Sequence, residues 1–522
     1  MGEAERSVER GDLAPVMADD GSDLPYELWR GIDVPKLEGL ISELQIPPRS
    51  AALHSLWLRL ITSNVTPPPD GSANEQFVAL RLEALYRSGL LEAASSELTN
   101  LPASTPLLAI LAARNEIALG YTQAGCKMAL SAGAPSAHTP KPLMGQAALI
   151  SGYCAAIAGD TAGAGLAAEL AREEGVTKSA GLRALDAISL GTPPNIAPDE
   201  PLTVLDYRLI RAAHGNLDSG TVLKNAGPAL LAALSLDPDA EPGLKLAAGE
   251  AAAQANSITP EELATIYRQQ GRAVSGADAP GTSQHRASLF VAAETETTPQ
   301  RKVRFIRSFL DDARRAGLYL TALRMVAPLS NNIVPTPDIG WYAETAVEIS
   351  LAADDPARAR IWANFGSSNG ASNLDHWLTL IDIADVQGSG DRDASLRYVE
   401  GPAVEGRLDP TLLHRLATVL DALEYNVPIP LWEAASRTPQ PAGGYLPETG
   451  VLSELQQASK KQEFGRTVLL VMKTLGPDGA EGANLLALGD AIRALKRAGI
   501  EADARRLGFE ALFASWPRTI VN

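Results

Sequence analysis

The stretch LEALYRSGLLEAASSEL (residues 82–98) sets two apolar-rich runs on either side of a single glycine, Gly89, and places Ala94 five residues further on. Glycine readily adopts the left-handed backbone conformation that ends a helix in a tight turn. Alanine adds little bulk, so the helix after the turn is able to approach the helix before it closely. The stretch therefore predicts a hairpin of two α-helices.

The same pairing of a glycine with an alanine five residues later recurs along the chain. The further copies are Gly159 with Ala164, Gly317 with Ala322, and Gly499 with Ala504, and looser variants begin at Gly120, Asp354 and Gly390. Gly89 and Gly159 are 70 residues apart, and Gly317 and Asp354 are 37 apart. A period near 35 residues is typical of solenoids in which each helical hairpin buries an apolar face against the next.

Four segments resemble the tetratricopeptide-repeat (TPR) family, in which a turn glycine is followed at this spacing by a small alanine. They are ALYRSGLLEAASSEL (84–98), AAIAGDTAGAGLAAELA (155–171), DARRAGLYLTALRMV (312–326) and ALKRAGIEADARRLGFEAL (494–512). The resemblance implies a right-handed superhelical α-solenoid of divergent TPR-like helix–turn–helix repeats. It also implies repeat junctions at Gly89, Ala94, Gly159, Ala164, Gly317, Ala322, Gly499 and Ala504. The alternative is an irregular all-α domain in which the spacing is coincidental.

Composition favours helices independently of the repeat. The chain has 522 residues, of which 85 are alanine, and aromatic residues make up only 5%. Alanine is the strongest helix former, and the 36 prolines and 44 glycines favour many short helices over a few long ones. We therefore expect an all-α fold.

Stretches rich in proline, glycine and small residues predict the domain boundaries, above all residues 271–284 and 436–450. We expect a disordered acidic N-terminus over 1–24, an N-terminal α-solenoid over 25–270, a middle α-solenoid over 285–435 and C-terminal helical repeats over 450–516.

The net charge of −17 disfavours nucleic acid and anionic membrane surfaces as partners. No run of about 20 apolar residues predicts a transmembrane segment. The N-terminal residues lack the apolar core of a secretory signal, so the chain as it stands is expected in the cytoplasm. A periplasmic location remains the alternative if an upstream signal has been removed or missed.

Motifs for catalysis or metal binding are missing from the sequence. The histidines are dispersed and none lies four residues from another, which excludes a helical metal site of the HExxH type; they are His54, His138, His214, His285, His376 and His414. No phosphate-binding loop, nucleophile elbow or dinucleotide fingerprint occurs in a strand–turn–helix setting. We predict no catalytic residues, no cofactor and no metal, and we interpret His54 and His414 as core or boundary histidines with satisfied hydrogen bonds.

Two further segments have a structural and a functional interpretation. The basic segment 298–317 contains six basic side chains; we interpret it as a solvated helix face balanced by Asp311 and Asp312, and docking of an acidic partner is the alternative. The motif LPETG (446–450) matches a sortase recognition sequence, but about 70 residues follow it. We interpret it as a turn in which Thr449 caps the next helix.

The only two cysteines are Cys126 and Cys154. In the repeat register, Cys126 lies near the start of the second helix of one hairpin, and Cys154 lies within the first helix of the next. Such positions commonly face each other. A disulfide in an oxidising compartment and two buried free thiols are both compatible with this placement.

These observations together favour a non-enzymatic scaffold whose groove binds a protein or peptide. The alanine-rich composition, with 34 arginines against 11 lysines, resembles that of bacterial envelope-associated proteins, including those of alphaproteobacteria. This resemblance implies a periplasmic role in envelope maintenance or assembly. The alternatives are the accessory superhelical domain of a cell-wall-acting enzyme, similar to that of lytic transglycosylases, and a cytoplasmic regulatory scaffold.

Overall fold

A computed structural model describes residues 24–25, 27–63, 74–99, 105–131, 140–197, 199–271, 279–368, 373–386 and 393–518. Helices contain 71% of these residues. The described ranges hold no β-strand; isolated bridges join Leu202 to Ala226 and Tyr445 to Ala483. The all-α prediction is therefore confirmed. The expected disordered segment 1–24 lies, except for Leu24, outside the described residues.

The described residues form two compact units, and their boundaries cut across the order of the sequence. The first unit takes residues from 1–74, 292–311 and 319–522, and the second takes them from 75–291 and 312–318. The boundaries drawn from composition at 271–284 and 436–450 stay predictions.

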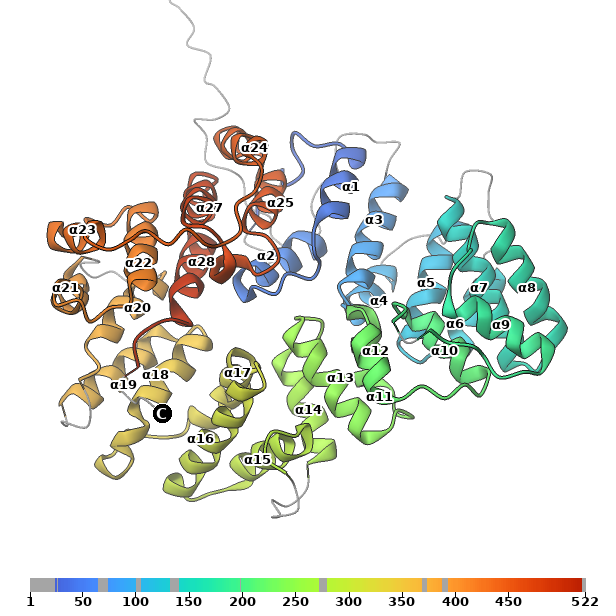
Figure 1. The fold of residues 1–522 in the computed structure, drawn as a ribbon, viewed down its shortest axis with the longest axis horizontal. Helices are drawn as coiled ribbons and strands as arrows, with labels where there is room; N and C mark the ends of the chain where they lie inside the picture. Colours follow the sequence, from blue (N-terminus) through green and yellow to red (C-terminus); the bar gives the residue numbers. More distant parts are fainter. Residues whose placement is uncertain are drawn as a thin grey trace, which may run out of the picture. The chain divides into compact units, whose positions relative to one another are not determined.

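The second unit is a succession of short helices in which chain neighbours pack on one another, most extensively α5 with α6, α7 with α8, α8 with α9 and α12 with α13. Figure 1 shows them in blue-green to green. Their bounds are α3 Asn74–Arg87, α4 Leu91–Thr99, α5 Pro106–Ala118, α6 Thr122–Ser131, α7 Lys141–Ile157, α8 Thr161–Glu173, α9 Ala180–Leu190, α10 Val204–Ala212, α11 Ser219–Asn225, α12 Pro228–Leu236, α13 Pro242–Gln254 and α14 Pro260–Gln270.

The first unit brings the two ends of the described chain together. Helix α1 packs on α25 and α2 on α28, as Figure 1 shows where blue helices lie against red ones. Its helices are α1 Val34–Glu43, α2 Ala51–Thr62, α17 Tyr319–Ser330, η3 Pro337–Tyr342, α18 Ala343–Ala352, α19 Pro356–Ser368, α20 His376–Ala384, η4 Ala394–Leu396, α21 Arg397–Val404, α22 Pro410–Ala422, α23 Ile429–Ser436, α24 Thr449–Lys460, α25 Phe464–Leu475, α26 Gly479–Gly482, α27 Leu485–Arg497 and α28 Glu501–Phe513. Helices α15 Ser283–Thr295 and α16 Pro299–Arg315 have residues in both units.

One kind of turn ends many of the helices. After α3, the amide of Gly89 donates to the carbonyl of Tyr86 (2.9 Å) and the amide of Leu90 donates to that of Leu85 (3.0 Å), with Gly89 at φ 73°. This pair of hydrogen bonds is the Schellman motif, which satisfies the last carbonyls of a helix. The same pair occurs around Gly120, Gly159, Gly175, Gly191, His214, Asn256, Gly317, Asp354, Gly406, Glu424, Gln462 and Gly499.

A small buried residue follows many of these turns at the fifth position. Six of these positions hold an alanine that is at most 2% exposed: Ala94, Ala164, Ala180, Ala322, Ala359 and Ala504. After Gly120 the position holds Gly125, where an added Cβ would lie 2.7 Å from Cγ1 of Ile117 and 2.8 Å from the carbonyl oxygen of Ala113. The second helix thus approaches the first too closely for a large side chain.

Side chains cap the starts of α14 and α22, among other helices. Thr259 caps α14 and forms a capping box with Glu262, while Asp409 accepts hydrogen bonds from the amides of Thr411 and Leu412 at the start of α22. The cap predicted at Thr449 is wrong. Thr449 is the first residue of α24, and the residue before it, Glu448, makes no side-chain cap.

Candidate functional site

The two cysteines lie on neighbouring helices and are bonded to each other in the structure. Cys126 belongs to α6 and Cys154 to α7, with their Cα atoms 5.7 Å apart. The bond joins the second helix of one hairpin to the first helix of the next, at the register positions expected from the repeat. Of the two forms that the sequence left open, the structure therefore describes the disulfide.

The histidines do not gather into a site. Among the residues that the structure describes, no three His, Cys, Asp or Glu side chains form a group suited to a metal ion. Nε2 of His414 lies 3.2 Å from the carbonyl oxygen of Thr438, to which it can donate, and 3.1 Å from the hydroxyl of the same residue. His54 departs from expectation, because its buried Nδ1 has no hydrogen-bond partner in the described part of the chain. His138 lies outside the described residues.

Burial also fixes the charge state of His54. Desolvation, together with the nearby cation of Arg324, lowers the pKa of His54 to about 4. The imidazole is therefore neutral at pH 7. A neutral, enclosed ring on α2 is suited to packing between helices and cannot attract an anion.

The basic helix α16 is partly balanced as expected. Arg307 pairs with Asp311 at 3.2 Å one turn away, and Arg301 pairs with Glu296 at 3.2 Å. Asp312 differs from the expectation, because its side chain is only 1% exposed and lies 3.0 Å from Arg286. It belongs to a buried cluster with Glu250, and it also lies 3.8 Å from the exposed Arg315, so it balances one arginine of the solvated face.

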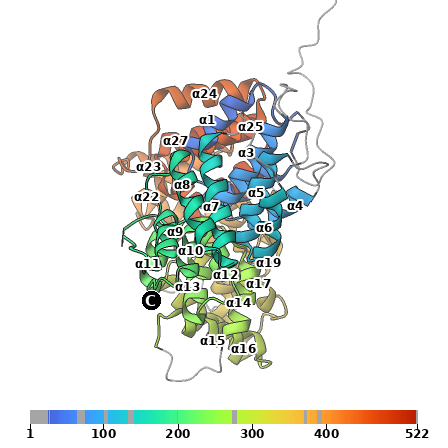
Figure 2. The same ribbon diagram turned by 90° about the vertical axis from the view of Figure 1, so that its right-hand side faces the viewer.

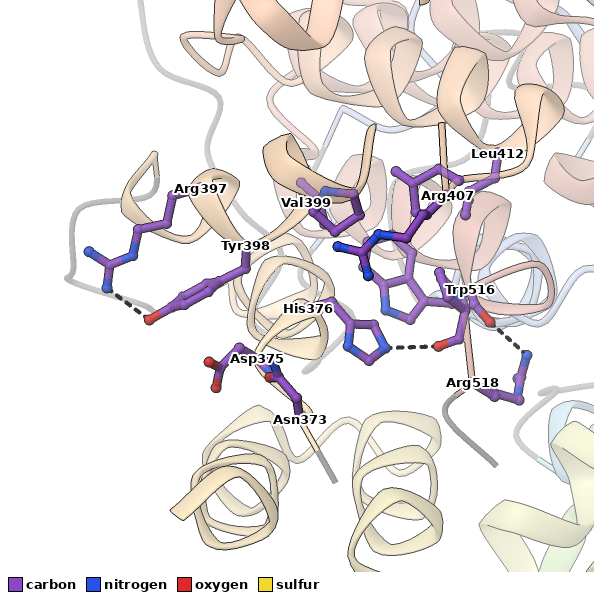
Figure 3. Close-up of a pocket in the computed structure, with 13 residues that line it drawn as sticks. Asn373, Asp375, His376, Arg397, Tyr398, Val399, Arg407, Leu412, Trp516 and Arg518 are labelled. Atoms are coloured by element: carbon purple, nitrogen blue, oxygen red, sulfur yellow. Dashed lines mark hydrogen bonds between the residues drawn. The ribbon is translucent and has the colours of Figure 1, made fainter. Parts of the chain in front are cut away.

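A pocket of about 540 Å³ lies in the first unit, among α20, α21, α22 and the segment that follows α28. Its volume is within the range of small-molecule sites. Figure 3 shows residues from these elements around it. The lining residues are Asn373, Asp375, His376, Arg397, Tyr398, Val399, Pro402, Arg407, Leu408, Leu412, Trp516, Pro517 and Arg518.

Hydrogen bonds hold the segment after α28 in place as one wall of this pocket. Nε2 of His376 lies 2.9 Å from the carbonyl oxygen of Pro517. Arg518 donates from Nε to Oε1 of Glu348 at 2.5 Å and from Nη1 to the carbonyl oxygen of Trp516 at 3.0 Å. The indole of Trp516 packs on that of Trp377, with ring centroids 6.5 Å apart. These contacts fix residues 516–518 against α20 and α18, and Glu348 balances the charge of Arg518.

Two exposed arginines, Arg397 and Arg407, also belong to the pocket lining. The guanidinium of Arg397 lies 4.7 Å from the ring centroid of Tyr398 and donates to its hydroxyl at 2.8 Å. Arg407 is exposed and pairs through Nε with Glu405 at 2.6 Å. Asp375 is the one carboxylate among the described lining residues. Burial lowers the pKa of His376, which keeps its ring neutral at pH 7.

A donor without a partner lies in the pocket wall. Trp516 is 2% exposed, and its Nε1 finds no acceptor among the residues that the structure describes. Figure 3 places the Trp516 indole on the same side of the pocket as His376. A buried donor left without an acceptor costs about 1–3 kcal/mol.

Large exposed apolar side chains concentrate on α6 to α9 in the second unit. Figure 2 shows α7, α8 and α9 packed side by side. Helix α8 buries small residues and exposes large apolar ones. Its buried face consists of alanines, while Leu166 and Leu170, one turn apart, are 74% and 46% exposed. The further exposed apolar residues on these helices and their turns are Tyr121, Met128, Leu130, Ile157 and Leu190. We call Leu166, Leu170 and Leu190 the leucine face.

Leu190 extends the leucine face from α8 onto α9. A Cβ added at Gly165 would lie 2.6 Å from Oγ of Ser189, so the residues before Leu166 and Leu190 are in direct contact. Exposed apolar groups that adjoin in this way are typical of interaction surfaces.

No family model matches this chain, and neither a curated protein nor a solved structure matches it. No described helix is long and apolar enough to cross a membrane.

Proposed function

We propose that this chain is a divergent TPR-like α-solenoid of right-handed superhelical form, and that it is a non-enzymatic scaffold that binds a protein partner. The leucine face is the observation that carries the proposal. Leu166 and Leu190 are each 74% exposed on adjoining helices, where an apolar side chain contributes nothing to the fold. Covering one such side chain with a partner contributes about 1.5–3 kcal/mol.

The repeated turn supports the solenoid part of the proposal. The Schellman turn at Gly89 is followed by the buried Ala94, and the same unit recurs at Gly159 with Ala164. A chain of such hairpins presents a row of second helices to a partner. Helix α8 is one of these second helices, and its leucines face outward while its alanines pack inward.

The disulfide supports a periplasmic location in a bacterial envelope. Disulfides persist in oxidising compartments and are rare in the cytosol. Cys126 and Cys154, the only cysteines of the chain, are bonded to each other. A scaffold that acts in envelope maintenance or assembly would lie in such an oxidising compartment. Fractionation of the native cells tests it, since recovery only in the cytoplasmic fraction would contradict the proposal.

The binding experiment compares two sets of exposed leucines. We would capture partners from native cells with the wild-type chain, purify the strongest one and measure its affinity directly. Leu166→Ser combined with Leu170→Ser is expected to weaken binding at least about tenfold, because truncating central apolar contacts removes most of an interface's energy. Leu486→Ser is the matched control, since Leu486 is 63% exposed on α27 in the other unit.

Two results would contradict the proposal. One is equal affinity of the partner for the double variant and for the wild-type chain. The other is an equal loss of affinity in Leu486→Ser, which would show a general effect of removing an exposed leucine. Thermal unfolding of all three proteins shows whether each variant is folded, and we expect similar stability because the substituted side chains are solvent-exposed.

A further inference from the structure

The geometry points to a binding site for a small aromatic carboxylate in the pocket among α20, α21, α22 and residues 516–518. The site lies in the unit that does not contain the leucine face. It is therefore a second function, independent of the proposed scaffold role. Three properties of the pocket carry the inference: its apolar body, the charge at its rim and an unsatisfied donor in its wall.

The body of the pocket suits a flat apolar group. The lining includes the apolar side chains of Val399, Pro402, Leu408 and Leu412 and the aromatic residues Tyr398 and Trp516, beside its polar members. Aromatic rings pack well on such surfaces, and a volume of about 540 Å³ holds a molecule of one or two rings. Inorganic phosphate has no apolar part with which to fill this space.

The rim selects for negative charge. Arg397 and Arg407 are both exposed there, and Arg407 uses only its Nε in the pair with Glu405 that the structure describes. Arginine binds carboxylates with two parallel N–H donors, so the terminal nitrogens of Arg407 are suited to that role. Asp375 is the one opposing charge among the described lining residues. Glu405, which is not a lining residue, pairs with Nε of Arg407 and leaves its terminal nitrogens for a ligand.

The indole of Trp516 supplies a donor that the protein itself does not use. The side chain is 98% buried, and its Nε1 has no acceptor in the described part of the chain. It belongs to the pocket lining, beside the neutral His376. A carboxylate oxygen of the ligand would provide the acceptor and remove the cost of the unmade hydrogen bond. Such a donor also discriminates against ligands that carry no acceptor.

An NMR titration of the full chain with 2-naphthoate, 2-naphthamide and inorganic phosphate tests the site. We expect 2-naphthoate to bind with a dissociation constant on the order of 1 mM or tighter. The amide, which has the same rings without the charge, is expected to bind about tenfold more weakly, because charge-assisted hydrogen bonds are the strong ones. Phosphate at the same concentration is expected to leave naphthoate binding unchanged.

Variants locate the binding within the pocket. Arg407→Gln and Arg397→Gln are each expected to weaken naphthoate binding about tenfold. Arg437→Gln, at an exposed arginine directly after α23 and outside the pocket, serves as the unchanged control. Trp516→Phe keeps an aromatic ring and removes the donor, and we expect it to weaken binding about fivefold.

The proposal is overturned if naphthoate does not bind, if the amide binds equally well, or if phosphate displaces naphthoate. It is also overturned if the pocket variants bind like the Arg437→Gln control. The two arginine variants replace exposed side chains, so a failure to fold is not expected to obscure the result.

Discussion

Two hairpins of this chain share one local design and differ in what covers them. In the α7–α8 hairpin Gly159 turns the chain at φ 78° and Ala164 is fully buried; in the α27–α28 hairpin Gly499 turns it at φ 84° and Ala504 is fully buried. Both turns carry the same pair of backbone hydrogen bonds. The glycine–alanine unit therefore determines the hairpin in both places.

The outer face of the second helix separates the two hairpins. At the eleventh position after the turn glycine, α8 exposes Leu170 to 46%, whereas α28, on which α2, α20, α22 and α26 pack, leaves Glu510 only 8% exposed. Even the charged Arg505 is enclosed there. The comparison teaches that a local motif builds a hairpin, whereas contacts distant in sequence decide whether its outer face becomes core or remains available to a partner.

The largest effect is expected at Arg505, which joins α28 to its cover. Its Nη1 donates to the carbonyls of Asp382 and Ile383 at the end of α20, at 3.2 and 3.3 Å, and to the hydroxyl of Tyr425. Arg505→Ala leaves these buried acceptors without their donor and is expected to lower the free energy of unfolding by about 3–5 kcal/mol. Urea denaturation measures the loss.

The neighbouring Arg506 is the matched control for this prediction. Its side chain is 38% exposed, and it pairs with Asp503 at 3.5 Å. Arg506→Ala is expected to cost less than about 1 kcal/mol, as partly exposed ion pairs generally do. Equal losses in the two variants would show that α28 is not enclosed as described.

The next largest effect on stability is expected from the disulfide, which ties the α7–α8 hairpin to α6 and has no counterpart in the α27–α28 hairpin. Replacing Cys126 and Cys154 with serine is expected to lower the free energy of unfolding by about 3 kcal/mol, because the unfolded chain loses a closed loop. The intact mass of the non-reduced wild-type chain is expected to be two hydrogen atoms below that of the reduced chain. Alkylation of both thiols in the native, non-reduced protein would contradict the bond.

Overpacking tests the feature that the two hairpins share. Ala164→Leu and Ala504→Leu each insert a large side chain where the helices approach closely, and each is expected to cost about 1–3 kcal/mol. We expect the larger loss at Ala504, whose helix is packed on several sides. Unchanged thermal stability in both variants would contradict the close approach behind the repeat.

The smallest effect concerns His54 on α2, one of the helices that cover α28. Burial and Arg324 lower its pKa from 6.5 to about 4 in the folded chain. Between pH 4 and pH 6.5 the unfolded chain therefore binds the proton more readily than the folded chain does. Stability contributed by the neutral ring is therefore complete above pH 6.5 and falls as the pH drops towards 4. Between pH 8 and pH 5 the wild type should lose about 1–2 kcal/mol more than His54→Gln. Parallel losses in the two proteins would contradict the enclosed position of His54.

Sequence reasoning found what is local in this comparison. The turns at Gly89, Gly159 and Gly499 could be predicted, because glycine adopts a positive φ without strain. It also found the Asp354 turn, through the alanine that follows. It did not find the turns at Glu424 and Gln462, since these residue types rarely adopt a positive φ and no alanine follows either of them at the fifth position.

One of the two candidate sites could be predicted from local sequence, and the other could not. The leucine face was open to prediction, since Ala164, Ala167 and Ala171 share one side of a helix while Leu166 and Leu170 share another. The pocket was not, because His376, Arg407 and Trp516 come from separate elements and form no local motif. Only the packing of the segment after α28 against α20 brings them together.

Site-specific photo-crosslinking in native cells tests the central claim most directly. A photoreactive phenylalanine analogue would replace Leu170 on α8 in one chain and Leu486 on α27 in another, because both leucines are exposed, at 46% and 63%. The leucine face predicts a discrete crosslinked partner from position 170 that is missing from position 486. Identical crosslinking patterns from the two positions, or no crosslinked protein from position 170, would contradict the claim that α8 presents a binding surface.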